Sequence, residues 1–109
     1  MLSRIREICD ADPVRESCGV VVRNNDTGAV HVVPVVNVVQ TPSAVVEFTM
    51  DPMVWSQIQR DVRRGRDKTH EVIYRFHSHP ISIAWPSSVD IAAARYPQRE
   101  IIYSIRYNT

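Results

Sequence analysis

Two histidines two residues apart, in a chain that has only four histidines, are the residues best suited to chemistry. His77 and His79 follow a run of apolar and aromatic residues that is typical of a strand. In an extended strand, side chains two residues apart point to the same face, so both imidazoles can converge on one point while Ser78 faces away. Imidazole is a ligand suited to zinc, copper, iron or nickel. Alone, the pair is weak support for a metal site, because two strand histidines are more often ordinary polar residues.

A segment farther along the chain offers a third ligand, and it also has an ordinary structural explanation. Ser87 and Asp90 form an S-x-x-D pattern before an apolar run, which is typical of a capping box at the start of a helix. Asp90 in the first helical turn can instead direct its carboxylate toward the histidines. Two histidines, one carboxylate and a water make a four-coordinate zinc site with an open position, the usual arrangement for hydrolysis. Trp85, just before this segment, either packs under the loop or forms a wall on the substrate side.

A hydrolytic zinc site also needs a general base, a carboxylate close to the metal-bound water. The candidate is Glu16, which lies just before the first predicted strand. Considered alone, it would be interpreted as a solvent-facing glutamate. Gly19 nearby is interpreted as a site of close backbone approach. A competing H-E-x-x-H motif starting at His70 fails, because position 74 is Tyr74 and the second ligand is missing.

Helices and strands must position these residues, and the sequence predicts both. Apolar residues at helical spacing predict a first helix that ends at Asp12-Pro13. Asp51-Pro52 is a typical start for a second helix that ends near Gly65, and 87–95 forms a third. The predicted strands cover 18–22, 30–36, 45–48, 71–76 and 100–106, with a hairpin turn at 24–28. This order predicts an α/β fold with a single mixed β-sheet flanked by helices.

Length and composition exclude several classes of protein. The 109 residues suffice for one domain, and 44% hydrophobic with 23% charged residues is typical of a soluble globular chain. A formal net charge of +1 gives no reason to expect nucleic acid as a partner. No apolar span reaches about 18 residues and no signal peptide is recognisable, so we expect no membrane partner and a cytoplasmic location. Cys9 and Cys18 form no C-x-x-C pair and are interpreted as buried thiols.

Taken together, the motifs resemble the JAMM (MPN-plus, Mov34/PAD-1) zinc metalloprotease family, whose signature is an upstream Glu followed by H-x-H and S-x-x-D. The chain is most similar to the short bacteriophage versions at the start of tail assembly proteins. In those versions an E-S-C-G strand, a V-N turn, a Met-x-Pro-x-x-Trp helix start and a tryptophan before the S-x-x-D recur. The corresponding segments here are 16–19, 34–37, 50–55, 77–80 and 84–90.

The resemblance implies a role for each residue of the signature. His77, His79 and Asp90 would ligate Zn²⁺, Glu16 would be the acid and base acting on the bound water, and Ser87 would hydrogen-bond near the developing oxyanion. The fold would be the JAMM/MPN arrangement, which is similar to that of cytidine deaminases. The substrate would be a protein or peptide with a scissile peptide or isopeptide bond. Phage tail proteins would be partners, and a phage-encoded chain would lie in the virion tail.

Two other functions stay open from the sequence. The chain is either a structural or interaction module of a phage tail tip with a retained zinc site, or a bacterial JAMM peptidase acting on a ubiquitin-like or sulfur-carrier protein. The presence of Glu16 favours an enzyme, because a purely structural module has no need of a base. Phage relatives often carry a following NlpC/P60 cell-wall peptidase domain. Residues 1–109 are therefore expected to form a single metallopeptidase domain that either stands alone or is a fragment of a longer chain.

Overall fold

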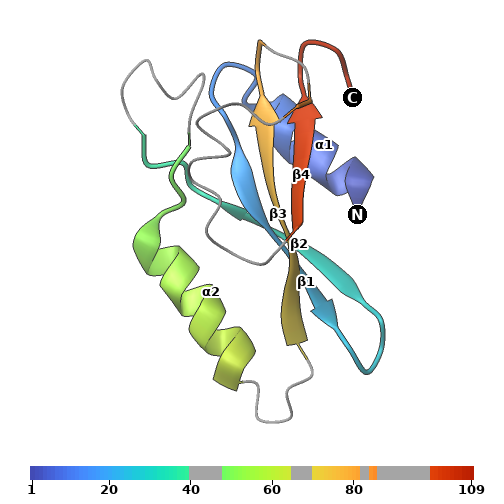
Figure 1. The fold of residues 1–109 in the computed structure, drawn as a ribbon, viewed down its shortest axis with the longest axis vertical. Coiled ribbons are helices and arrows are strands. Elements are labelled where there is room, and N and C mark those ends of the chain that lie inside the picture. Colours follow the sequence, from blue (N-terminus) through green and yellow to red (C-terminus); the bar gives the residue numbers. More distant parts are fainter. Residues whose placement is uncertain (40–47, 65–69, 82–83, 86–98) are drawn as a thin grey trace.

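The computed structural model describes residues 1–39, 48–64, 70–81, 84–85 and 99–109. The predicted helix at 87–95 and most of the predicted strand at 45–48 lie outside these ranges. Phe48, the last residue of that predicted strand, is described and is not part of a strand. The elements follow one another as shown in Figure 1. They are α1 (Leu2–Ala11), β1 (Cys18–Asn24), β2 (Val30–Val35), α2 (Pro52–Arg64), β3 (His70–His79) and β4 (Arg99–Ser104).

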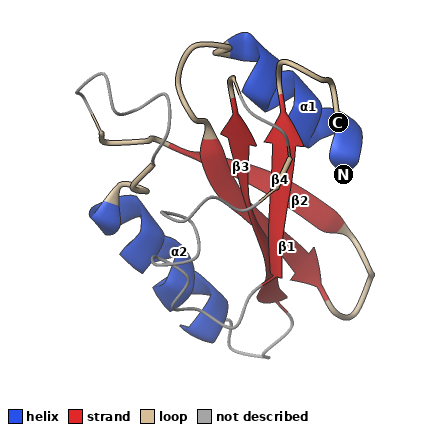
Figure 2. Ribbon diagram, turned by 45° about the horizontal axis from the view of Figure 1, so that its top comes forward, coloured by secondary structure: helices blue, strands red, loops and turns tan. Residues whose placement is uncertain are grey.

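The four described strands form one mixed sheet in the order β2-β1-β3-β4. β1 pairs antiparallel with both β2 and β3, and β4 pairs parallel with β3. The hairpin between β1 and β2 is the predicted one, with Gly28 at a φ of 75° in its turn. Figure 2 shows the two helices against this twisted sheet. The predicted α/β fold with a single mixed sheet flanked by helices is thus confirmed.

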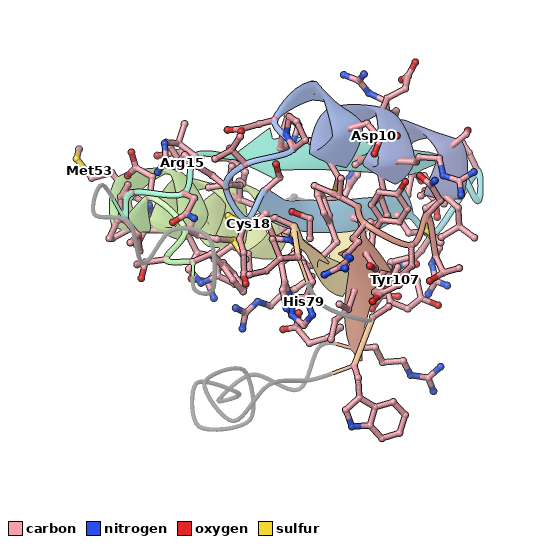
Figure 3. All side chains as sticks on the ribbon, turned by 90° about the horizontal axis from the view of Figure 1, so that it is seen from above. Asp10, Arg15, Cys18, Met53, His79 and Tyr107 are labelled. Carbon is pink, nitrogen blue, oxygen red and sulfur yellow. The ribbon has the colours of Figure 1, made fainter. Side chains whose placement is uncertain are left out.

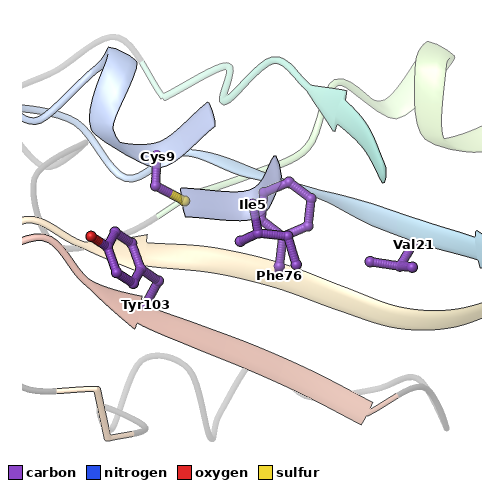
Figure 4. Packing of buried hydrophobic residues seen from close by; sticks show 5 residues of the cluster. All are labelled: Ile5, Cys9, Val21, Phe76 and Tyr103. Atoms are coloured by element: carbon purple, nitrogen blue, oxygen red, sulfur yellow. The ribbon is translucent and has the colours of Figure 1, made fainter. Parts of the chain in front are cut away.

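Helix α1 covers one face of the sheet because its apolar residues recur at helical spacing. Ile5 and Cys9 are buried against Val21 of β1, Phe76 of β3 and Tyr103 of β4. Figure 4 shows these five side chains gathered between α1 and the strands. The helix ends at Ala11, as expected from Asp12-Pro13.

Helix α2 belongs to the opposite face of the sheet. Its start is the predicted one, because Asp51 Oδ1 accepts hydrogen bonds from the backbone N–H groups of Met53 (3.0 Å) and Val54 (3.4 Å). The apolar residues of this second core come from alternate positions of β1, the end of β2, the segment before α2 and α2 itself. They are Cys18, Val20, Val35, Met50 and Trp55. Neighbouring residues of β1 therefore serve opposite faces, as strand geometry requires.

Several strand boundaries differ from the predicted ones, including both ends of β3, which runs from His70 to His79 instead of over 71–76. β1 continues to Asn24 and contains a register shift between Val21 and Val22, and β2 stops at Val35. The prediction that the last strand reaches residue 106 was wrong, since β4 ends at Ser104. Its hydroxyl oxygen accepts a hydrogen bond from the backbone N–H of Tyr107 at 3.3 Å, which closes a turn there. None of the described helices has the length and apolar character needed to cross a membrane.

Candidate metal centre

Three buried side chains offer metal ligands to one another at the end of β1 and β3. They are Glu16, His77 and His79, whose ligand atoms, one from each residue, all lie within 4.8 Å of one another. Each of these residues is at most 2% exposed. Among the described residues, these three are the His, Cys, Asp or Glu side chains that lie close enough together to hold a metal ion.

The alternation of β3 places both histidines on the face of the sheet that lies opposite α1. His77 pairs across the sheet with Cys18, which belongs to the core on the α2 side. Ser78 points the other way and lies near the Cys9 thiol under α1. Figure 3 shows His79 on one side of the strands and Asp10 of α1 on the other. The prediction that both imidazoles share a face while Ser78 faces away is confirmed.

Two hydrogen bonds of Ser17, the residue just before β1, hold Glu16 near the histidines. The N–H of Ser78 donates to the carbonyl of Ser17 at 2.9 Å, and the N–H of Ser17 donates to the Ser78 hydroxyl oxygen at 2.8 Å. The first bond continues the β1–β3 pairing by one residue, and the second, to a side chain, helps it to hold Glu16 next to β3. Glu16 is therefore buried, unlike the solvent-facing glutamate for which it would be taken if considered alone.

Asn37 fixes the Glu16 backbone from the other side. Its amide nitrogen Nδ2 donates to the carbonyl of Glu16 at 2.9 Å. Its Oδ1 accepts from the N–H groups of Val39 and Thr49, both at 3.1 Å. Arg15 in turn donates to the carbonyl of Asn37 at 2.8 Å. This buried amide thus joins three segments of chain directly behind the glutamate.

Gly19 permits the close packing of β1 against its neighbours. A Cβ at this position would overlap the carbonyl oxygen of Val33 and lie 2.6 Å from two ring atoms of Phe76. Phe76 is fully buried and immediately precedes His77. The predicted close approach at Gly19 is therefore confirmed, and it sets the distance between the strand that follows Glu16 and the strand that carries the histidines.

The His77 ring is held by two further neighbours. It stacks on Phe48 with ring centroids 4.6 Å apart and an interplanar angle of 27°. Its Nδ1 lies 3.5 Å from a carboxylate oxygen of Glu100 in β4. Neither neighbour was predicted from the sequence. The alternation of Arg75, His77 and His79 along β3 does predict that an arginine shares the face of the histidines.

Cys18 beside His77 is not equipped to act as a nucleophile. Burial raises the pKa of its thiol to about 12, with the Glu16 carboxylate acting in the same direction and Arg75 opposing it. The thiol is therefore neutral at physiological pH and donates to the carbonyl of Val35 at 3.3 Å. This agrees with the interpretation of Cys18 as a buried thiol.

The donor set fits a zinc ion. Zinc–nitrogen and zinc–oxygen bonds are about 2.0–2.2 Å long, so two ligand atoms on one ion lie at most about 4.4 Å apart. The separations of up to 4.8 Å between Glu16, His77 and His79 come close to that limit, and small side-chain rotations bring the three groups onto one ion or its water. Two imidazoles with a carboxylate are also ligands that zinc accepts in hydrolytic sites.

Of the three other residues that the sequence pattern suggested for the site, the structure describes one. Ser87 and Asp90 lie outside the described residues, and their roles stay predictions. Trp85 is 71% exposed, which contradicts the interpretation that it packs under the loop.

Comparison with known proteins finds a matching family and similar solved structures. A family model described as prokaryotic homologs of the JAB domain matches residues 1–108. The solution structure of protein DSY2949 from Desulfitobacterium hafniense is similar with a TM-score of 0.70 and 28% sequence identity. The match covers 97% of this chain and 70% of that one. No curated protein matches the chain.

Proposed function

Because the chain belongs to the family of prokaryotic homologs of the JAB domain, we propose that it is a zinc-dependent metallopeptidase that hydrolyses a peptide or isopeptide bond. The observation that supports this proposal is the buried group of Glu16, His77 and His79. Burying two imidazoles and a carboxylate on the core side of a sheet costs free energy that apolar side chains would not. A metal ion shared by these side chains offsets this cost. A water beside the ion offers the carboxylate a proton to accept.

In this proposal each residue of the site has one task. His77 and His79 hold the zinc ion together with Asp90. A zinc ion held there would supply Lewis acidity, which would lower the pKa of a water to about 7 and polarise the scissile carbonyl. Glu16 takes the proton of the attacking water and returns it to the leaving amine. The Ser87 hydroxyl donates a hydrogen bond to the developing oxyanion.

The proposed substrate is a protein or peptide, and the proposed setting is a phage tail. The phage-tail setting is supported by a resemblance: the segments at 16–19, 34–37 and 50–55 are similar to segments that recur in short tail-associated versions of the domain. Tail proteins are then the partners, and the chain is found in the virion tail or in the cytoplasm where tails assemble.

The experiment measures zinc content and hydrolysis in the same preparations. Wild type, Glu16→Gln and His77→Ala are tested on peptide, isopeptide and peptidoglycan stem-peptide substrates. We expect His77→Ala to lose zinc, and Glu16→Gln to keep it while losing activity by about 10²- to 10⁴-fold, as expected for removal of a general base. Glu7→Gln is the matched control, because Glu7 is an exposed glutamate of α1 that pairs with Arg4.

Each outcome bears on a different part of the proposal. Unchanged zinc in His77→Ala refutes the ligand assignment. Loss of zinc in Glu16→Gln makes Glu16 a ligand rather than the base. A wild-type chain that holds zinc but hydrolyses none of the substrates, together with tail assembly that tolerates Glu16→Gln, refutes the enzyme and supports a structural module.

A further inference from the structure

Glu100 of β4 contacts the metal centre from the neighbouring strand. In the parallel pairing of β3 with β4, Glu100 lies beside Arg75, and Ile102 lies beside His77. Side chains of paired residues share a face of the sheet, so Glu100 lies on the same face as both histidines. One carboxylate oxygen lies 3.3 Å from Arg75 Nε, and the other lies 3.5 Å from His77 Nδ1.

These contacts hold the His77 ring on two sides. Phe48 stacks on the ring face, and the Arg75 guanidinium carbon lies 5.9 Å from the centroid of the Phe48 ring. Arg75 therefore contacts both the carboxylate at the edge of His77 and the aromatic ring on its face. Since Nδ1 lies beside the Glu100 carboxylate, Nε2 is the ring nitrogen that would ligate a metal ion.

We propose that Glu100 is a positioning residue of the metal centre, and this inference rests on the proposed zinc site. A neutral imidazole has one N–H and one lone pair, and a ligand must present the lone pair to the metal. A carboxylate beside Nδ1 selects the tautomer with the proton on that atom, which directs the Nε2 lone pair to the ion. Carboxylates that act on a ligand histidine in this way raise its basicity and fix its orientation.

The geometry distinguishes this role from that of an ordinary surface ion pair. Arg23 and Glu71 form such a pair at the other end of β3, with side chains 44% and 46% exposed. The side chains of Arg75 and Glu100 are 11% and 31% exposed, and their pair contacts a ligand candidate that is almost fully buried. Glu71→Gln is therefore a matched control, because it removes one carboxylate from an arginine pair far from the metal centre.

The experiment titrates zinc and cobalt into metal-free wild type, Glu100→Gln, Glu100→Asp and Glu71→Gln. Competition with a chromophoric chelator gives the zinc dissociation constant, and the visible absorption of bound Co²⁺ reports the ligand geometry. We expect Glu100→Gln to bind zinc about 10- to 100-fold more weakly and to shift the cobalt bands. Glu100→Asp, which keeps a carboxylate on a shorter side chain, has an intermediate affinity. Glu71→Gln binds as wild type does.

Equal zinc affinities and equal cobalt spectra in Glu100→Gln and Glu71→Gln would refute the positioning role, whatever the stabilities of the two variants. Should Glu100→Gln not fold, Glu100→Asp decides: a weaker affinity than wild type supports the role, and an equal one overturns it. A wild-type chain that binds no zinc refutes the metal centre and the role of Glu100 with it. A wild type that binds zinc as tightly as both Glu100 variants leaves the metal centre in place and refutes the role of Glu100 alone.

Discussion

Replacement of Gly19 by alanine tests whether the packing of β1 sets the geometry of the metal centre. The new Cβ would overlap two neighbouring groups that cannot easily move away. One is the backbone carbonyl oxygen of Val33 in β2, which is tied into the sheet. The other is the ring of Phe76, 2.6 Å away and fully buried. Ordinary contacts of a Cβ are at 3.4 Å or more, so β1 must move relative to a neighbouring strand.

The expected loss in the free energy of unfolding lies at the upper end of the range for an overpacked core. Overpacking by a methyl group typically costs about 1–3 kcal/mol, and we expect about 3 kcal/mol here because backbone is involved. At about 4–8 °C per kcal/mol for a small domain, Tm falls by about 12–24 °C. Total stabilities of about 5–15 kcal/mol leave most of the protein folded at 25 °C, so metal binding can be measured.

The control is Gly28→Ala in the hairpin turn. Gly28 has a φ of 75° and no atom within 4 Å of the position a Cβ would take, so the cost is only the left-handed conformation, about 1 kcal/mol. Urea unfolding and zinc titration of both variants separate the two effects. We expect Gly19→Ala to lose about three times as much stability and to bind zinc more weakly, and Gly28→Ala to bind zinc normally. A Gly19→Ala protein that is no less stable than Gly28→Ala, or that binds zinc as wild type does, contradicts the reasoning.

Two further predictions concern buried polar groups. Asn37→Ala removes the hydrogen bonds to the Glu16 carbonyl and from Val39 and Thr49, which we expect to cost about 2–3 kcal/mol in urea unfolding; wild-type stability would show that water replaces the amide. Burial raises the pKa of Cys9 from 9.0 to about 12, so the folded state favours the neutral thiol. Its contribution to stability is complete below pH 9 and declines by up to about 1.4 kcal/mol per pH unit as the pH rises toward 12. Cys18 contributes an equal decline, so unfolding followed between pH 8 and 11 should fall about half as steeply in Cys9→Ala as in wild type, and a Cys9→Ala variant with the wild-type slope would assign the decline to other groups.

The parts of the site that depend on one element were predictable from sequence. The shared face of His77 and His79 follows from the period of a strand, and the start of α2 follows from Asp51-Pro52. Both required only residues close together in the chain.

The parts that depend on pairing between distant strands were not predictable from local patterns. Glu16 meets the histidines through the β1–β3 register, which joins segments about sixty residues apart. Only the resemblance to a known family pointed to that residue. Glu100 reaches His77 through a parallel pairing, and nothing near residue 100 signals it. Phe48 was predicted as a strand residue, but it is not part of a strand and stacks on His77, while the nearby Met50 pairs with Asn37 in an isolated bridge.

The order of the strands in the sheet has a consequence for the newly synthesised chain. β1 is made early, but its site-forming partner β3 follows only after β2 and α2 have been translated. A nascent chain therefore exposes Glu16 on the ribosome long before either histidine exists, and Glu100 arrives later still. A metal ion meets the three site residues together only after β3 has left the ribosome and paired with β1. Chains that stop before His77 carry the carboxylate but neither imidazole, so incomplete translation products cannot assemble this site.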